Sequence, residues 1–190
     1  MLYIIPDYYF DFHCIAERCE DTCCAGWQIV IDKKSLRKYR KVKGSYAREL
    51  RKRIRWQKRI FCQDKEKRCA FLNENNLCDL YTNLGAKSLC RTCRMYPRHV
   101  EEFENVREIS LSVSCPEVAR ILMERETPVH FRTFEKEGEE SWDDFDPFLF
   151  SILQDAREGM FQILQNRELD ISIREKLVLG MAHDIQGRVN

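Results

Sequence analysis

A chain of 190 residues can bury one substantial core. Its composition, 44% hydrophobic and 33% charged, is typical of a globular protein. No apolar run approaches the roughly 18 residues that cross a bilayer, and the N-terminus lacks the features of a signal peptide. We therefore expect a cytoplasmic protein without a membrane partner, in which thiols stay reduced.

The charge is unevenly distributed along the chain. The net charge is only +1, but residues 33–59 hold fourteen Lys and Arg against the single acid Glu49. Such a segment can be a solvated helix face, a docking surface for an acidic protein or a nucleic-acid contact. Because no nucleic-acid recognition motif accompanies it, we do not expect nucleic acid as a partner.

The ten cysteines all lie in the first 115 residues. Their number, in a reducing compartment, favours ligation of a metal ion or an iron–sulfur cluster over a disulfide framework. The sequence contains no phosphate-binding glycine loop, nucleophile elbow or zinc-protease motif. Any chemistry is therefore expected to depend on the bound metal or cluster.

The N-terminal half predicts several short elements. Residues 27–32 alternate as in a half-buried strand. Asp32 or Ser35 is expected to cap a helix from about residue 34, which is broken or bent at Gly44-Ser45 and resumes to about Ile60. Residues 69–78 indicate a hairpin around an Asn-rich turn, and a short helix is expected over residues 80–89.

The C-terminal half predicts one strand and several helices. Residues 106–114 alternate as a strand, and Ser114 to Glu117 resembles a capping box that begins a helix to about residue 126. Seven acids in residues 135–146 indicate a solvated loop. Apolar residues recur at helical spacing from residue 145, and a second capping box at Ser172 opens another helix.

We therefore predict a mainly α-helical α+β fold, with a small β element in a cysteine-rich metal-binding core and a C-terminal helical pair. The expected domains are the cysteine-cluster domain (1–126), an acidic linker (127–146) and a helical region (147–190).

The cysteine spacings predict a metal site without identifying the metal. Cys90 and Cys93 are spaced to bind one ion, and Cys69 and Cys78 could complete a four-thiolate set for zinc or for iron–sulfur. In the doublet Cys23-Cys24 neighbouring side chains diverge, so both seldom bind the same ion. Ten thiols permit two four-thiol sites, or one cluster with structural thiols. Cys62 best fits a buried apolar residue.

These motifs together resemble a known family. The run from Cys14 through Cys19 and Cys23-Cys24 to Trp27 is similar to the N-terminal signature of the flagellin lysine N-methylases, within the wider cysteine-cluster proteins that chelate zinc or iron. The similarity continues through Cys69 to Leu72, Cys78, Leu89 to Cys93 and Tyr96 to Arg98. It ends with Leu111 to Arg120 and covers about residues 8–125.

The resemblance implies an enzyme that transfers a methyl group from S-adenosylmethionine to lysines of flagellin, or of another protein with exposed lysines, using a [4Fe–4S] cluster. Nine cysteines would form its ligand pool: Cys14, Cys19, Cys23, Cys24, Cys69, Cys78, Cys90, Cys93 and Cys115. Methyl transfer needs a neutral lysine amine, and Glu17, Glu20, Asp21 and Glu117 are candidate proton acceptors. The alternative is a non-catalytic zinc- or iron-binding module that docks a protein or nucleic-acid partner through its basic helix.

Overall fold

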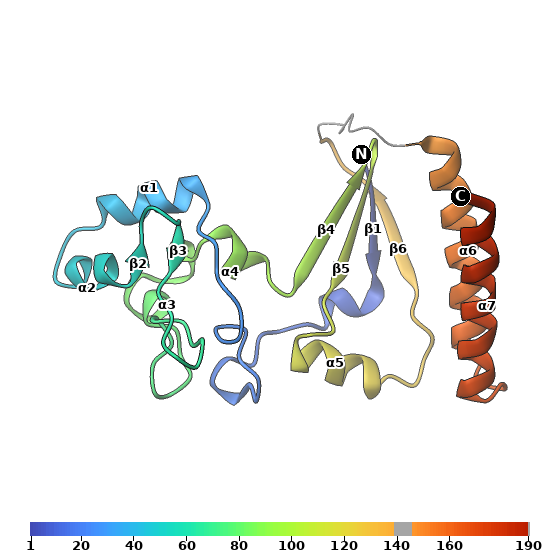
Figure 1. Cartoon of the computed structure of the whole chain (residues 1–190), viewed down its shortest axis with the longest axis horizontal. Coiled ribbons are helices and arrows are strands. Elements are labelled where there is room, and N and C mark those ends of the chain that lie inside the picture. The colour runs from blue at the N-terminus through green and yellow to red at the C-terminus, as the bar shows by residue number, and fades with distance from the viewer. Residues whose placement is uncertain (139–145, 190) are drawn as a thin grey trace. The chain divides into compact units, whose positions relative to one another are not determined.

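The strands of the main sheet come from distant parts of the chain. In the computed structural model, which describes residues 1–138 and 146–189, β1 (Leu2–Pro6), β4 (Arg98–Phe103), β5 (Val106–Leu111) and β6 (Phe131–Glu135) form a sheet (Figure 1). Its strand order is β4-β5-β1-β6. Of these four strands only β5 corresponds to a predicted strand, and β6 lies within residues 127–146, which were expected to be an acidic linker.

The basic segment folds as two helices and a small hairpin. α1 (Lys33–Lys41) begins at Asp32, whose carboxylate accepts the Ser35 backbone N–H as predicted. α2 (Tyr46–Lys52) ends earlier than expected, because the chain turns into β2 (Ile54–Arg55) and β3 (Ile60–Phe61). These strands are antiparallel, with Ile54 opposite Phe61.

The predicted strand over residues 27–32 is reduced to a single bridge between Val30 and Ile60. The alternation of residues 29–31 nevertheless predicted burial correctly, since Ile29 and Ile31 are buried and Val30 is exposed. The hairpin over residues 69–78 is likewise a single bridge, between Leu72 and Cys78.

Short helices follow the hairpin. α3 (Asp79–Leu84) ends at Gly85, whose φ of 77° favours glycine, and a 3-10 turn (Ala86–Ser88) follows. α4 (Arg91–Met95) begins after Cys90. α5 (Pro116–Met123) begins where expected, but its first residue follows Cys115 and no side chain caps it, so the predicted capping box is wrong.

The predicted C-terminal helical pair is confirmed. α6 (Pro147–Gln165) and α7 (Ile171–Val189) lie side by side (Figure 1). Asp146 caps α6, and Asp170, rather than Ser172, accepts the backbone N–H of residue 172 at the start of α7. Among the described residues no helix is both long and apolar enough to span a membrane.

The chain divides into two compact units. One comprises Met1–Ile4, Glu102–Arg107 and Glu126–Asn190, and the other comprises Ile5–Glu101 and Glu108–Arg125. β1, β4 and β5 contribute residues to both units. All ten cysteines belong to the second unit, so the candidate site can be described within it. The predicted domain limits at residues 126 and 147 stay predictions.

Candidate functional site

Five thiols share the hydrophobic core of the cysteine-rich unit. Cys69 and Cys90 are buried among Ile31, Leu50, Phe71 and the other core side chains. Three more are half-buried and pack against the same core. We call these five the inner thiol group: Cys24, Cys69, Cys78, Cys90 and Cys93.

Backbone contacts bring the segments of the inner thiol group together. The Cys69 backbone N–H donates to the Cys24 carbonyl at 2.7 Å. Cys90 precedes α4, whose first backbone N–H, from Arg91, donates to the Asp32 carboxylate at 2.8 Å. The Sγ atoms of Cys90 and Cys93 lie 3.6 Å apart. Asp32 therefore joins the start of α1 to the two-residue knuckle that the sequence predicted.

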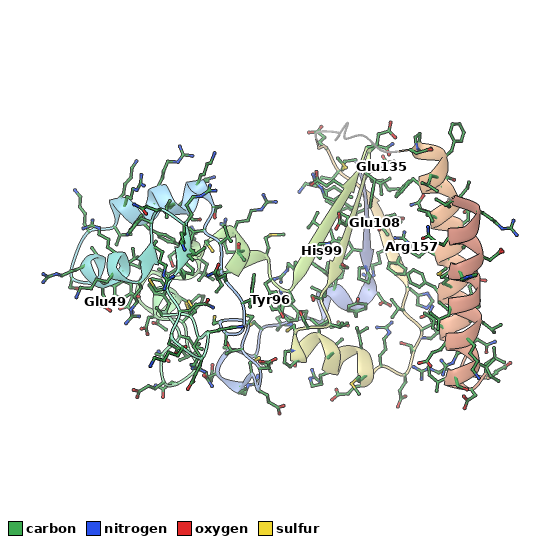
Figure 2. The ribbon with its side chains drawn as sticks, viewed as in Figure 1. Glu49, Tyr96, His99, Glu108, Glu135 and Arg157 are labelled. Atoms are coloured by element: carbon green, nitrogen blue, oxygen red, sulfur yellow. The ribbon has the colours of Figure 1, made fainter. Side chains whose placement is uncertain are left out.

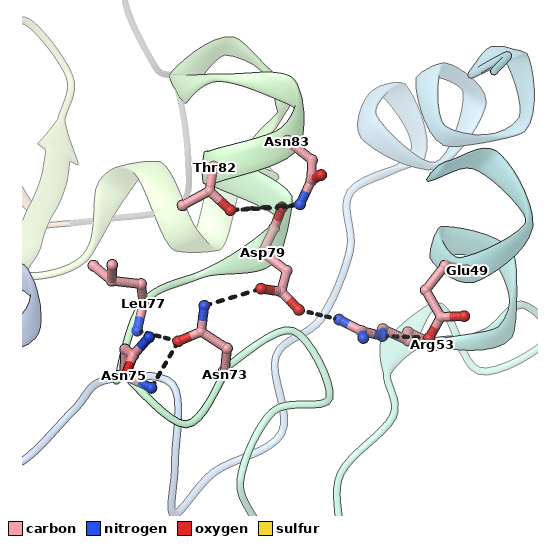
Figure 3. Close-up of polar contacts among 8 residues, drawn as sticks. All are labelled: Glu49, Arg53, Asn73, Asn75, Leu77, Asp79, Thr82 and Asn83. Atoms are coloured by element: carbon pink, nitrogen blue, oxygen red, sulfur yellow. Dashed lines mark hydrogen bonds and ion pairs between the residues drawn. The ribbon is translucent and has the colours of Figure 1, made fainter. Parts of the chain in front are cut away.

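A polar network fixes the segment that carries Cys78. The Asp79 carboxylate accepts bonds from Arg53 at 2.6 Å and from Asn73 at 3.0 Å (Figure 3). The Asn73 side-chain oxygen accepts the backbone N–H groups of Asn75 and Leu77, which shapes the Asn-rich turn. Arg53 also pairs with Glu49 at 2.9 Å. This network could not be predicted from the sequence, because charge patterning gives no sign that Arg53 faces inward.

Burial and mutual repulsion set the pKa values of these thiols. Burial raises the pKa of Cys69 to about 12, and charge on Cys24, Cys78 or Cys90 opposes its ionisation further. Burial likewise raises the pKa of Cys78. A hydrogen bond between Cys90 and Cys93 lowers the pKa of Cys90 to about 7 and raises that of Cys93. Cys69 and Cys78 therefore resist ionisation, whereas Cys90 ionises more readily than an ordinary thiol.

The remaining predicted ligands form a second neighbourhood, which we call the outer thiol group: Cys14, Cys19, Cys23 and Cys115. Negative charge on Cys115 and Cys14 contributes, after burial, to the raised pKa of Cys19. The doublet Cys23-Cys24 connects the two groups. A hydrogen bond from Cys23 lowers the pKa of Cys24 to about 7.

Neither thiol group forms a complete metal-binding site in the described part of the chain. Within residues 1–138 and 146–189, no three His, Cys, Asp or Glu side chains are placed to hold a metal ion. The helices and sheets described above confirm the α+β fold class. The metal-binding core stays a prediction. Cys62 lies apart, with its thiol directed at the Lys52 carbonyl at 3.7 Å.

A cavity of about 380 Å³ lies beside the outer thiol group. Its walls include Asp21, Cys23, Trp27, Tyr96 and Ser114. Tyr96, labelled in Figure 2, directly follows α4. Trp27 and Tyr96 belong to the motifs that resemble the family, and no signal in the sequence indicated that they meet.

The candidate proton acceptors occupy different environments. Asp21 lines the cavity, whereas Glu17 is exposed on a 3-10 turn. Both carboxylate oxygens of Glu117 accept bonds from Arg120, at 2.7 and 2.9 Å, and this pairing lowers the pKa of Glu117. Asp21 is therefore the carboxylate best placed to meet a ligand in this cavity.

The basic segment is partly used within the fold. Figure 2 shows nitrogen-tipped side chains projecting from α1 and α2. Arg51, however, donates to the carbonyls of Arg40 and Val42 at the end of α1, and the Arg40 guanidinium lies over the Trp56 ring. Arg53 is likewise used within the fold, so the predicted solvated face can include only the remaining basic side chains of the segment.

These features define an α+β protein with a cysteine-rich, partly buried thiol core. No protein-family profile and no solved structure matches the chain. Over 126 residues, 62% of the chain, it is 35% identical to the flagellar biosynthetic protein FliU of Salmonella muenchen, of which it covers 75%. The chain is also 35% identical, over 62% of its length, to the lysine-N-methylases of Salmonella choleraesuis and Salmonella typhimurium. It covers 31% of each of these two relatives.

The chain therefore belongs to the flagellin lysine N-methylase family. It spans about a third of the length of the relatives named lysine-N-methylase.

Proposed function

We propose that this protein is a protein-lysine N-methyltransferase that modifies flagellin, with S-adenosylmethionine as the methyl donor. The observation that carries the proposal is the 35% identity, over 126 residues, to relatives named lysine-N-methylase and flagellar biosynthetic protein. In the structure, the cavity beside Asp21 supports it, because a carboxylate there can accept the proton that a lysine loses before methyl transfer.

The methyl-transfer proposal is tested by incubating the anaerobically purified chain with flagellin and S-adenosylmethionine labelled in its methyl group. Label is expected on the ε-amines of flagellin lysines, and its transfer should require both the chain and the donor. Label that never reaches lysine in the presence of folded, metal-loaded protein would contradict the proposal.

We further propose that the inner thiol group holds a [4Fe–4S] cluster, for which four cysteine thiolates are the usual ligands. Two observations support it: five thiols contact one core, and two of them, Cys90 and Cys93, are 3.6 Å apart. The lowered pKa values of Cys24 and Cys90, about 7, make these two thiols the readiest to act as thiolate ligands, and the raised pKa values of Cys69 and Cys78 fit thiols that lose their protons on binding a cation. With a thiolate on each of its irons, a cluster bound there would tie together the segments of the chain that carry these thiols.

Metal analysis tests the cluster separately from the activity. Protein purified without oxygen should be brown, absorb broadly in the visible range and contain iron and acid-labile sulfide. A colourless protein with stoichiometric zinc would contradict the cluster and favour a structural metal in the same thiols.

A further inference from the structure

The cavity beside Cys23 has two aromatic walls and one carboxylate. The ring centroids of Trp27 and Tyr96 lie 6.1 Å apart, and their planes are tilted by 39°. The two rings therefore form an open corner instead of stacking on each other. Trp27 is 40% exposed, so part of its indole is accessible to a ligand in the cavity.

Both rings are held through their polar edge atoms. The Trp27 indole N–H donates to the Cys23 carbonyl at 2.9 Å. The Tyr96 hydroxyl shares a hydrogen bond of 3.1 Å with the Ser114 hydroxyl, which is bonded in turn to Ser112 at 2.7 Å. These bonds fix the orientation of the rings without using their faces, so the corner is preorganised for a ligand.

The residues that line the cavity favour a positively charged ligand. The faces of Trp and Tyr attract an organic cation, and the Asp21 carboxylate adds a full negative charge. Among the described residues, no Lys or Arg forms an ion pair with Asp21 that would neutralise it. The site therefore lacks an internal cation and suits one brought by a ligand.

We propose that this cavity binds the ε-ammonium group of a substrate lysine, against the Trp27 and Tyr96 rings and beside Asp21. The choice of lysine among organic cations rests on the proposed methyltransferase function. Cys23 lines the cavity and the next residue, Cys24, belongs to the inner thiol group. The proposed lysine site is therefore connected to the inner thiol group through the Cys23-Cys24 doublet.

Binding of short peptides to the anaerobically purified chain tests this assignment by calorimetry. The probes are one capped peptide with a central lysine and the same peptide with dimethyl-lysine or norleucine. Both lysine forms should bind, and norleucine, which has the apolar stem but no charge, should bind at least about tenfold more weakly.

Variants of the walls locate the binding. Trp27→Leu should weaken lysine-peptide binding about tenfold, Trp27→Phe less, because phenylalanine keeps a weaker ring face, and Asp21→Asn should also weaken it. Trp56→Phe is the matched control, since the Trp56 indole faces Arg40 and does not line the cavity. Its affinity should equal that of the unchanged protein. The conservative Trp27→Phe substitution keeps the test valid if Trp27→Leu fails to fold.

The assignment is overturned if the norleucine peptide binds as tightly as the lysine peptide, or if Trp27→Leu and Trp27→Phe both leave affinity unchanged. It is also overturned if S-adenosylmethionine, and not the peptide, binds in a manner that depends on Trp27. Methyl transfer with an unchanged KM for flagellin in Trp27→Leu would defeat this inference alone. Trp27-dependent peptide binding without methyl transfer would defeat the proposed function alone.

Discussion

Arg53 connects the basic segment to the thiol-bearing hairpin through one half-buried side chain. It donates to Asp79 at 2.6 Å and to Glu49 at 2.9 Å, and its guanidinium lies 5.5 Å from the centre of the Phe71 ring. The Arg53 and Asp79 side chains are 24% and 22% exposed, so solvent screens this pair less than an ion pair on the surface.

Asp79→Ala should therefore destabilise the protein by about 1–3 kcal/mol, because Arg53 and Asn73 lose their shared acceptor. Urea unfolding followed by circular dichroism measures the change. The matched control is Asp184→Ala, which removes an exposed ion pair with Arg188 and should cost less than about 0.5 kcal/mol. Equal losses for the two substitutions would contradict the role of the Arg53 network.

At the scale of elements, Asp32 links two helix starts. Its carboxylate accepts the Ser35 backbone N–H at 2.9 Å in α1 and the Arg91 backbone N–H at 2.8 Å at the start of α4. Burial alone would raise the pKa of Asp32, but these bonds outweigh it and hold the pKa at about 2. The same cap therefore positions Cys90, the residue immediately before Arg91.

This cap predicts a pH-dependent stability. Because the folded pKa is below the unfolded value of about 3.9, the ionised carboxylate stabilises the fold above about pH 4, and this contribution is lost as the pH falls through 2. Asp32→Ala should be less stable than the unchanged protein by about 1 kcal/mol at neutral pH, with the difference shrinking below about pH 4.

Urea unfolding at several pH values checks the prediction for Asp32. The control is Asp32→Asn, which keeps a capping oxygen but cannot ionise, so its stability relative to Asp32→Ala should not vary with pH. A difference between Asp32→Ala and the unchanged protein that stays constant down to pH 2 would show that the carboxylate charge is not responsible.

Local signals predicted elements well where one residue decides the geometry. Asp32 as a helix cap, the turn at Gly44-Ser45 and the pair of C-terminal helices were all predicted from single residues or from helical spacing. β4 and β6 were not, because strand pairing depends on distant partners, and β6 lies within residues 127–146, which were expected to be a linker.

The candidate site shows the same division between local and distant information. The spacing of Cys90 and Cys93 predicted two neighbouring sulfurs, which the structure places 3.6 Å apart. The contact of Trp27 with Tyr96, however, joins residues 69 positions apart by number, and no periodicity in the sequence predicts it.

At the scale of the whole molecule, the thiols and the cavity lie in one compact unit, and α6 and α7 lie in the other. The chain covers 75% of the relative FliU but only 31% of the relatives named lysine-N-methylase. The central claim is therefore that the cysteine-rich unit itself supplies the thiols on which methyl transfer depends.

Mass spectrometry of methyl-lysine on flagellin tests that claim most directly, with two single-thiol variants compared under anaerobic conditions. Cys90→Ser removes a fully buried member of the inner thiol group, whereas Cys62→Ser removes a half-buried thiol outside it. We predict methyl-lysine from the unchanged protein and from Cys62→Ser, and none from Cys90→Ser. Undiminished methyl-lysine formation by Cys90→Ser would contradict the account.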